Sequence, residues 1–191
     1  MEMGSNLYLG LVHYPVYDKR REIVASAVTN FDIHDIARCA RTYGVGGFFV
    51  ITPLESQVHL VGRVIHHWMA GAGLHYNPTR GESLSLIRVS RTIEEADREI
   101  SRVWNGKVER VATGASPFPE SIGFGALRKL IEERARAFLL LFGTGWGLTQ
   151  EVKASADYVL SPIEGKGYNH LSVRSAVSII LDRLLGERGC D

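Results

Sequence analysis

Apolar segments with the spacing of strands alternate with helical segments along the whole chain. Residues 138–142 (FLLLF) lack a polar position, which is typical of a strand covered on both faces of a sheet. Residues 92–104 place apolar side chains three and four positions apart, as in an amphipathic helix. The pattern predicts strands at 6–16, 46–51, 84–89, 108–112, 138–142 and 158–160, and helices at 29–43, 55–70, 92–104, 126–137 and 172–185.

This alternation predicts an α/β fold: a mostly parallel sheet of about six strands with helices on both faces, in one domain over residues 1–191. The composition, 45% hydrophobic and 23% charged residues, excludes a disordered, collagen-like or coiled-coil chain.

The charge is nearly balanced, with 22 Lys and Arg against 21 Asp and Glu and a formal net charge of +1. This balance excludes a uniformly basic surface, so any nucleic acid must bind a local patch. The candidate RNA-binding residues are Lys19, Arg20, Arg21, Arg41 and Arg80. For residues 19–21, an ordinary solvated charged loop is an equally good interpretation.

The two cysteines, Cys39 and Cys190, lie far apart and outside any Cys/His cluster, so we expect neither a disulfide framework nor a metal site. The adjacent His66 and His67 point apart on a helix and lack a carboxylate at metal-ligand spacing. With no long apolar segment and no leader-like N-terminus, we expect a cytoplasmic protein without a membrane partner.

Three glycine-containing loops follow predicted strands, where parallel sheets bind their ligands. They are residues 113–116, 143–147 and 161–169. Glycine lets a backbone approach a ligand closely, although tight turns alone would also explain these residues. The chain has neither the GxGxxG of dinucleotide-binding folds after its first strand nor a GxxxxGK[ST] phosphate loop, which argues against both classes.

Taken in order, the late segments resemble the SPOUT superfamily of S-adenosylmethionine (SAM)-dependent RNA methyltransferases. The matching segments are residues 139–148 (LLLFGTGWGL), 159–165 (VLSPIEG) and 170–176 (HLSVRSA). The resemblance implies a C-terminal trefoil knot at about 108–186, a homodimer, and SAM as cofactor. The implied cofactor-binding residues are Thr113, Gly114, Ala115, Phe142, Gly143, Thr144, Gly147, Leu148, Ser161, Pro162, Ile163, Gly165, Tyr168, Asn169, Leu171 and Ser172.

Residues 32–44 (DIHDIARCARTYG) resemble the first family motif, in which Arg38 matches the family arginine and Asp32 replaces an asparagine. The glycine turn at 143–147 lacks the usual glutamate, and His170 and Ser172 stand where many members have Ser and Asn. These departures indicate a divergent branch, one sometimes fused to tRNA (guanine-N1)-methyltransferases. They leave open whether the acceptor is a ribose 2′-oxygen or a base nitrogen, in tRNA or rRNA.

Helical spacing places His34, Arg38 and Arg41 on one stripe of the helix at 29–43. Arg38, Asp32 and His34 are the catalytic candidates, because a guanidinium stabilises charge at an acceptor and an imidazole accepts a proton. The alternative is a solvated surface, with Arg38 paired to Asp32 or Asp35. The alternative functions are a SAM-binding module without catalysis, partnering a tRNA-modifying enzyme, and methylation of a protein or small molecule.

Overall fold

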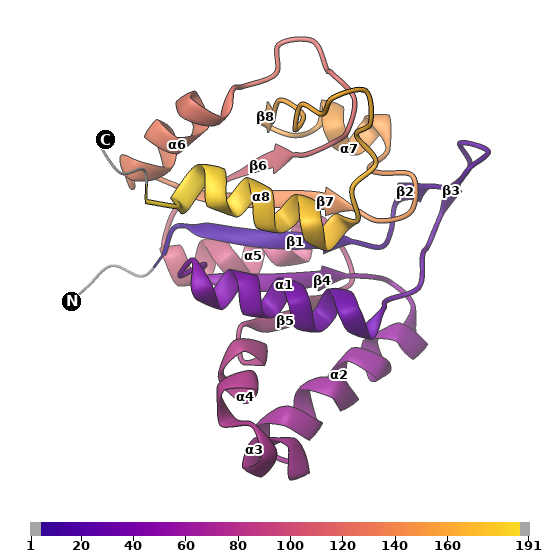
Figure 1. Ribbon diagram of the computed structural model, residues 1–191, viewed down its shortest axis with the longest axis vertical. Helices are drawn as coiled ribbons and strands as arrows, with labels where there is room; N and C mark the ends of the chain where they lie inside the picture. The colour runs from indigo at the N-terminus through magenta and orange to yellow at the C-terminus, as the bar shows by residue number, and fades with distance from the viewer. Residues whose placement is uncertain (1–4, 188–191) are drawn as a thin grey trace.

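A computed structural model describes residues 5–187 and places six parallel strands in one sheet (Figure 1). The strand order is β5-β4-β1-β7-β6-β8. The bounds are β1 Leu7–Val12, β4 Gly47–Ile51, β5 Ile87–Ser90, β6 Val108–Ala112, β7 Ala137–Gly143 and β8 Tyr158–Val159. Every neighbouring pair is parallel, so the predicted α/β class is confirmed.

Helices cover both faces of this sheet, and each face has its own apolar core. Helices α1 (Asn30–Thr42), α2 (Glu55–Met69), α6 (Phe124–Glu132) and α8 (Val173–Leu185) contribute to the core on one face. Helices α5 (Ile93–Trp104) and α7 (Gln150–Ala154) contribute to the core on the other. Figure 1 shows α1 and α8 side by side in front of the sheet and α5 behind it. Strand β1 serves both cores, because Leu9 and Tyr8 face opposite sides.

Two predicted elements have different bounds in the structure. The predicted strand at 84–89 begins only at Ile87, because residues 78–84 form helix α4 (Pro78–Leu84), with Pro78 in its first turn and Asn77 as its N-cap. The predicted helix at 126–137 is α6 at 124–132, because Ala137 already pairs with Val108 in the sheet.

Besides α4, four short elements were not predicted. Helix α3 (Ala72–Tyr76) joins α2 to α4, and these three helices form the lobe at the bottom of Figure 1. Strands β2 (Val16–Tyr17) and β3 (Ile23–Val24) form a hairpin after β1. Strand β1 itself ends at Val12, earlier than the strand predicted at 6–16. The fourth element, helix α7, follows β7.

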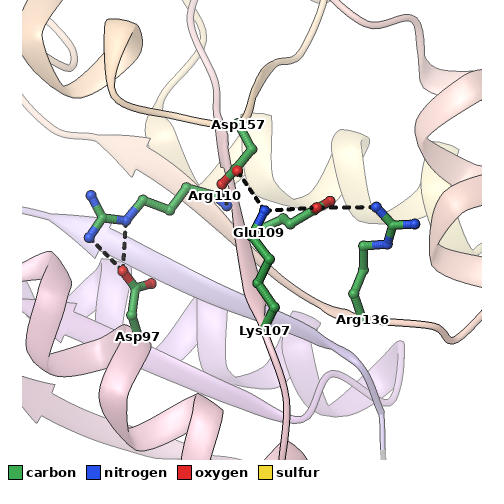
Figure 2. Close-up of polar contacts among 6 residues, drawn as sticks. All are labelled: Asp97, Lys107, Glu109, Arg110, Arg136 and Asp157. Carbon is green, nitrogen blue, oxygen red and sulfur yellow. Dashed lines mark hydrogen bonds and ion pairs between the residues drawn. The ribbon is translucent and has the colours of Figure 1, made fainter.

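A network of charged side chains joins the amino ends of β6, β7 and β8 (Figure 2). Glu109, whose side chain is 7% exposed, accepts from Lys107 at 3.3 Å and from Arg136 at 3.1 Å. Lys107 also reaches Asp157 at 3.2 Å, and the Arg110 Nε donates to Asp97 on α5 at 2.7 Å. The network lies at the amino ends of these strands, at the edge of the sheet opposite the loops predicted to bind a ligand.

Candidate functional site

The three loops predicted to hold a ligand lie together at the carboxyl edge of the sheet. The Leu160 amide donates to the Ala112 carbonyl at 2.8 Å, and the Ser161 amide donates to the Ile122 carbonyl at 2.9 Å. The Asn169 side chain donates to the Ala115 carbonyl at 3.0 Å. The segment after β8 therefore runs directly along the loop after β6.

The turn after β7 requires its glycines. A Cβ on Gly143 would overlap the backbone amide of Leu148, and Gly145 and Gly147 have φ of +59° and +95°. The turn is closed by the Gly147 amide, which donates to the Thr144 carbonyl at 3.0 Å. This geometry leaves a compact turn of main-chain groups beside the other two loops.

The hairpin after β1 holds this turn from one side. The Trp146 amide donates to the Tyr17 carbonyl at 2.9 Å, and the Tyr17 amide donates to the Gly147 carbonyl at 3.0 Å. The Trp146 side chain is 62% exposed. The backbone of the turn is thus fixed while its indole remains open to a ligand.

A buried chain of side-chain hydrogen bonds supports the same turn from beneath. Thr144 Oγ1 donates to the Val12 carbonyl at 3.0 Å and lies 2.5 Å from Ser26 Oγ, which lies 2.9 Å from His13 Nδ1. A hydroxyl has one proton, so Ser26 donates to Thr144, and His13 must carry its proton on Nδ1 to donate to Ser26. Burial lowers the pKa of His13 to about 4, so the imidazole is neutral at pH 7.

The loop after β8 contributes exposed aromatic and apolar surface. Tyr168 is 71% exposed and meets His170 edge to face at 5.4 Å, and Leu171 is 42% exposed. A Cβ on Gly165 would overlap the Tyr168 carbonyl, so this loop also needs a glycine at its fold. Ser172 caps α8 by accepting from the Ser175 amide at 3.3 Å.

The remaining residues predicted to bind cofactor fall into two groups. Thr113, Phe142 and Leu148 are buried: Thr113 donates to the Leu141 carbonyl at 2.9 Å, and the other two side chains belong to the two cores. These three can offer a ligand mainly backbone. The others line the loop surfaces and are exposed or half-buried: Gly114, Ala115, Pro162 and Ile163.

These loops have the chemistry that SAM requires. Main-chain amides and carbonyls can pair with an adenine edge, while Trp146, Tyr168 and Leu171 offer apolar surface. Lys153 of α7 lies against Gly114, and burial, followed by the charge of Arg21, lowers the pKa of its ammonium group.

Asp32 and Asp35, in the first turns of α1, pair with Arg174 of α8. The Arg174 guanidinium lies 3.3 Å from Asp32 Oδ1 and 3.4 Å from Asp35 Oδ2. Asp32 Oδ2 accepts from the Thr29 hydroxyl at 2.6 Å, and the Asp32 side chain is 9% exposed. Pairing of either aspartate with Arg38, the alternative considered from the sequence, is therefore not found among residues 5–187, and both Asp32 carboxylate oxygens already have partners.

His34 and Arg38 line a pocket of about 650 Å³ between α1, α2 and α4. The other lining residues are Asn30, Phe31, Asp35, Leu60, Arg63, Val64, His67, Trp68 and Arg80. Burial, and then the charges of Arg80 and Arg38, lower the pKa of His34, against the opposing effect of Asp35. His34 is thus a neutral imidazole near pH 7.

The candidate RNA-binding residues do not form one patch. Lys19, Arg20 and Arg21 are exposed at the tip of the β2–β3 hairpin, near the carboxyl edge of the sheet. Arg80 faces the α1–α2 pocket. Arg41 is in the last turn of α1, which leads back to the amino end of β4, and it is paired with Glu82. The charges are therefore spread over two surfaces instead of gathering at one mouth of the sheet.

Several residues of these sites were not predicted, and His13, Arg63 and Trp68 are examples. His13 ends the first strand, Arg63 and Trp68 lie on α2, and their partners are remote in sequence. A helical projection of α2 would have placed Arg63 and His67 on one stripe, because they are four residues apart.

Among residues 5–187, no group of three or more His, Cys, Asp or Glu side chains is gathered as a metal site. Within the same range, no helix combines the length and apolar character needed to cross a membrane. Cys39 is a half-buried free thiol, and Cys190 lies outside the described residues.

Comparison with known proteins agrees with this geometry. A family described as SAM-dependent RNA methyltransferase matches residues 6–186. A tRNA (guanine-N(1)-)-methyltransferase of Oleidesulfovibrio alaskensis is 44% identical over 96% of this chain, which spans only 43% of that relative. An uncharacterized protein of Aquifex aeolicus is 38% identical over 99% of this chain and 93% of its own length. The AdoMet-bound SpoU methyltransferase AviRb of Streptomyces viridochromogenes shares the fold, with a TM-score of 0.57 and 16% identity over 97% of this chain and 58% of that one.

Proposed function

Because this chain belongs to the family of SAM-dependent RNA methyltransferases, we propose that it transfers a methyl group from SAM to tRNA. The observation that carries the proposal is the convergence of the loops after β6, β7 and β8 at one edge of the sheet. The choice of tRNA is supported by the tRNA methyltransferase of O. alaskensis, of which this chain spans less than half. The proposal places the protein in the cytoplasm, together with its RNA substrate.

We assign the cofactor to the surface made by residues 113–115, 142–148 and 161–172. Backbone groups of the turn at Gly143–Leu148 hold the adenosine part, and Trp146 and Leu171 exclude water from it. When bound, SAM would supply an electrophilic methyl group: the acceptor atom would bond to the methyl carbon as the carbon–sulfur bond breaks, with S-adenosylhomocysteine as the leaving group. The chain therefore needs to position the acceptor and to stabilise charge there.

We assign the catalytic role to Arg38 and propose that it acts across a homodimer. Arg38 lies nine positions after the cap Thr29, so it is about 13 Å along α1 from the carboxyl edge of its own sheet. A second copy, docked through α1 and α8, would bring that guanidinium to the partner's cofactor loops. The C-terminal trefoil knot over about 108–186 is part of the same proposal, and the contact of residues 160–169 with the loop after β6 supports it.

Titration calorimetry with SAM tests the cofactor assignment. We expect saturable binding of one SAM per chain by the folded, dimeric protein. A folded sample that releases no binding heat, and shows no thermal stabilisation by SAM, would refute the assignment.

Transfer of tritium from labelled SAM to RNA tests the reaction. We expect label in tRNA purified from cells that lack the protein, and mass spectrometry of the digested nucleosides then identifies the acceptor atom. Tight SAM binding without any label in tRNA or rRNA would refute the RNA methyltransferase proposal and leave its two alternatives, a cofactor-binding module without catalysis and a methyltransferase for a protein or small molecule. The pairing of the Asp32 carboxylate with Thr29 and Arg174 is the observation that favours the module.

A further inference from the structure

We propose that the pocket between α1, α2 and α4 binds a single-stranded nucleotide of the RNA substrate, with a backbone phosphate on Arg63 and Arg80 and the base against Phe31. The inference rests on the proposed RNA methyltransferase function and adds a substrate site that lies away from the cofactor loops of the same chain. The pocket volume of about 650 Å³ is within the range of small-ligand sites, roughly 300–1,000 Å³.

The arginines of this pocket are not neutralised by carboxylates. Among residues 5–187, neither Arg38 nor Arg63 has an acidic partner within ion-pair distance. Asp35 is the one carboxylate that lines the pocket, and it is engaged by Arg174.

Other arginines nearby are arranged differently. Arg41, on the same helix as Arg38, is paired with Glu82, and Arg91 is paired with Glu55 at the start of α2. Arginines of α1 and of the segment after β5 thus have carboxylate partners outside the pocket, whereas Arg38 and Arg63, which line it, have none among residues 5–187. A guanidinium cluster whose lining carboxylate, Asp35, is already paired with another arginine favours a phosphate as its occupant.

One wall of the pocket is rigid and aromatic. The Arg80 guanidinium lies over the Trp68 ring at 4.7 Å, while His34 and His67 meet its edge at 5.6 and 5.1 Å. A Cβ on Gly73 would lie 2.7 Å from the same indole, so the backbone of α3 closes against it. Arg80 is therefore held in place before any ligand arrives, which lowers the entropic cost of binding phosphate.

The mouth of the pocket offers an open ring for a base. Phe31 is 72% exposed at the start of α1, and its only ring contact among residues 5–187 is the Arg174 guanidinium at 5.7 Å. An unpaired base stacks on an exposed aromatic ring regardless of its sequence. Arginines and an exposed phenylalanine that line the same pocket match the phosphate and the base of one nucleotide, whereas a free phosphate would leave the ring unused.

The test is fluorescence anisotropy of a fluorescein-labelled single-stranded RNA oligonucleotide, titrated with the intact protein at several salt concentrations. Arg63→Gln removes an exposed guanidinium, so the fold should survive, and Arg63→Lys keeps the charge without the planar fork. The matched control is Arg98→Gln, which removes an exposed arginine from α5 on the opposite face of the sheet.

We expect Arg63→Gln to weaken RNA binding about tenfold and to reduce the slope of log K against log salt by about 0.7, as for one lost phosphate contact. Arg63→Lys should fall between this variant and the wild type, and Phe31→Ala should weaken binding without changing the salt slope. Arg98→Gln should stay within about twofold of the wild type.

Equal binding by the Arg63→Gln and Arg98→Gln proteins would overturn the inference. So would a change of oligomeric state in Arg63→Gln by light scattering, because the pocket would then belong to a contact between two copies of the chain. Failure of the proposed function would appear separately, as absent SAM binding by the wild-type protein, a measurement that does not involve this pocket.

Discussion

The Arg174 guanidinium lies 3.3 Å from a carboxylate oxygen of Asp32, joining the first turn of the last helix to the first turn of α1. The second Asp32 oxygen accepts from the Thr29 hydroxyl, the cap of α1. One buried carboxylate therefore fixes a helix end and the packing of two helices. Loss of that carboxylate would leave Arg174 with only Asp35, whose side chain is 48% exposed.

Asp32→Ala should lower the free energy of unfolding by roughly 1–3 kcal/mol, because it removes a buried hydrogen bond from Thr29 and leaves a half-buried guanidinium poorly paired. Urea denaturation measures the change. Asp35→Ala, which removes the exposed carboxylate on the same arginine, should cost less than about 0.5 kcal/mol. Equal losses in the two variants would contradict this account of Asp32.

His13 should make the protein less stable in acid. Its pKa is about 4 in the folded protein against 6.5 in the unfolded chain, so the unfolded state binds the proton first as pH falls. No stability is lost to this titration well above pH 6.5, and the loss grows as the pH falls, reaching about 3 kcal/mol near pH 4.

Urea denaturation at pH 7 and at pH 4.5 tests this, with His13→Gln as the comparison because glutamine does not titrate. The variant should be less stable than the wild type at pH 7, and the gap should narrow at pH 4.5. A gap of constant size would mean that His13 does not titrate in this range.

Gly143→Ala should disrupt the turn after β7, because the added Cβ overlaps the Leu148 amide. We expect SAM affinity to fall more than tenfold, measured by calorimetry, since backbone has to move at the proposed cofactor surface. Gly125→Ala is the matched control: its Cβ meets nothing within 4 Å, and it lies in helix α6. That variant should bind SAM normally and gain roughly 0.5–1 kcal/mol of stability.

Arg38→Ala should leave SAM affinity within about twofold of the wild type while lowering kcat/KM for methyl transfer about a hundredfold or more. The reason is that Arg38 lies in the α1–α2 pocket and not in the cofactor loops. Tritium transfer and calorimetry separate the two effects, with Arg98→Ala as the control for losing one exposed arginine. A parallel loss of SAM affinity would contradict the proposed division of roles.

Much of the fold was predictable because local pattern and tertiary environment agree. The apolar run at 138–142 lies inside β7, between two neighbouring strands, and Thr92 caps the amphipathic helix α5 as expected from its position. Helix α4 was missed although Asn77 and Pro78 signal a helix start. Its apolar Leu84 runs into Leu86 and Ile87, so periodicity favoured one longer strand.

Of the candidate sites, one could be located from the sequence and the others could not. The glycine loops could be located from sequence, because each follows a strand of a parallel sheet. The α1–α2 pocket could not, because Arg38, Trp68 and Arg80 come from three different helices. The hydrogen-bonded series His13, Ser26 and Thr144 was equally hidden, since the pairing of β1 with β7 brings Thr144 to residues more than a hundred positions earlier in the chain.

That pairing also sets the order in which the chain can fold during translation. Among the strands of this sheet β1 is synthesised first, yet Leu7 pairs with Phe138, so one side of this strand stays without its partner until β7 has been made. Its other side can pair with β4 much earlier. A nascent chain stalled before residue 137 would expose an apolar strand edge, and it is at this stage of synthesis that chaperone binding would protect the protein most.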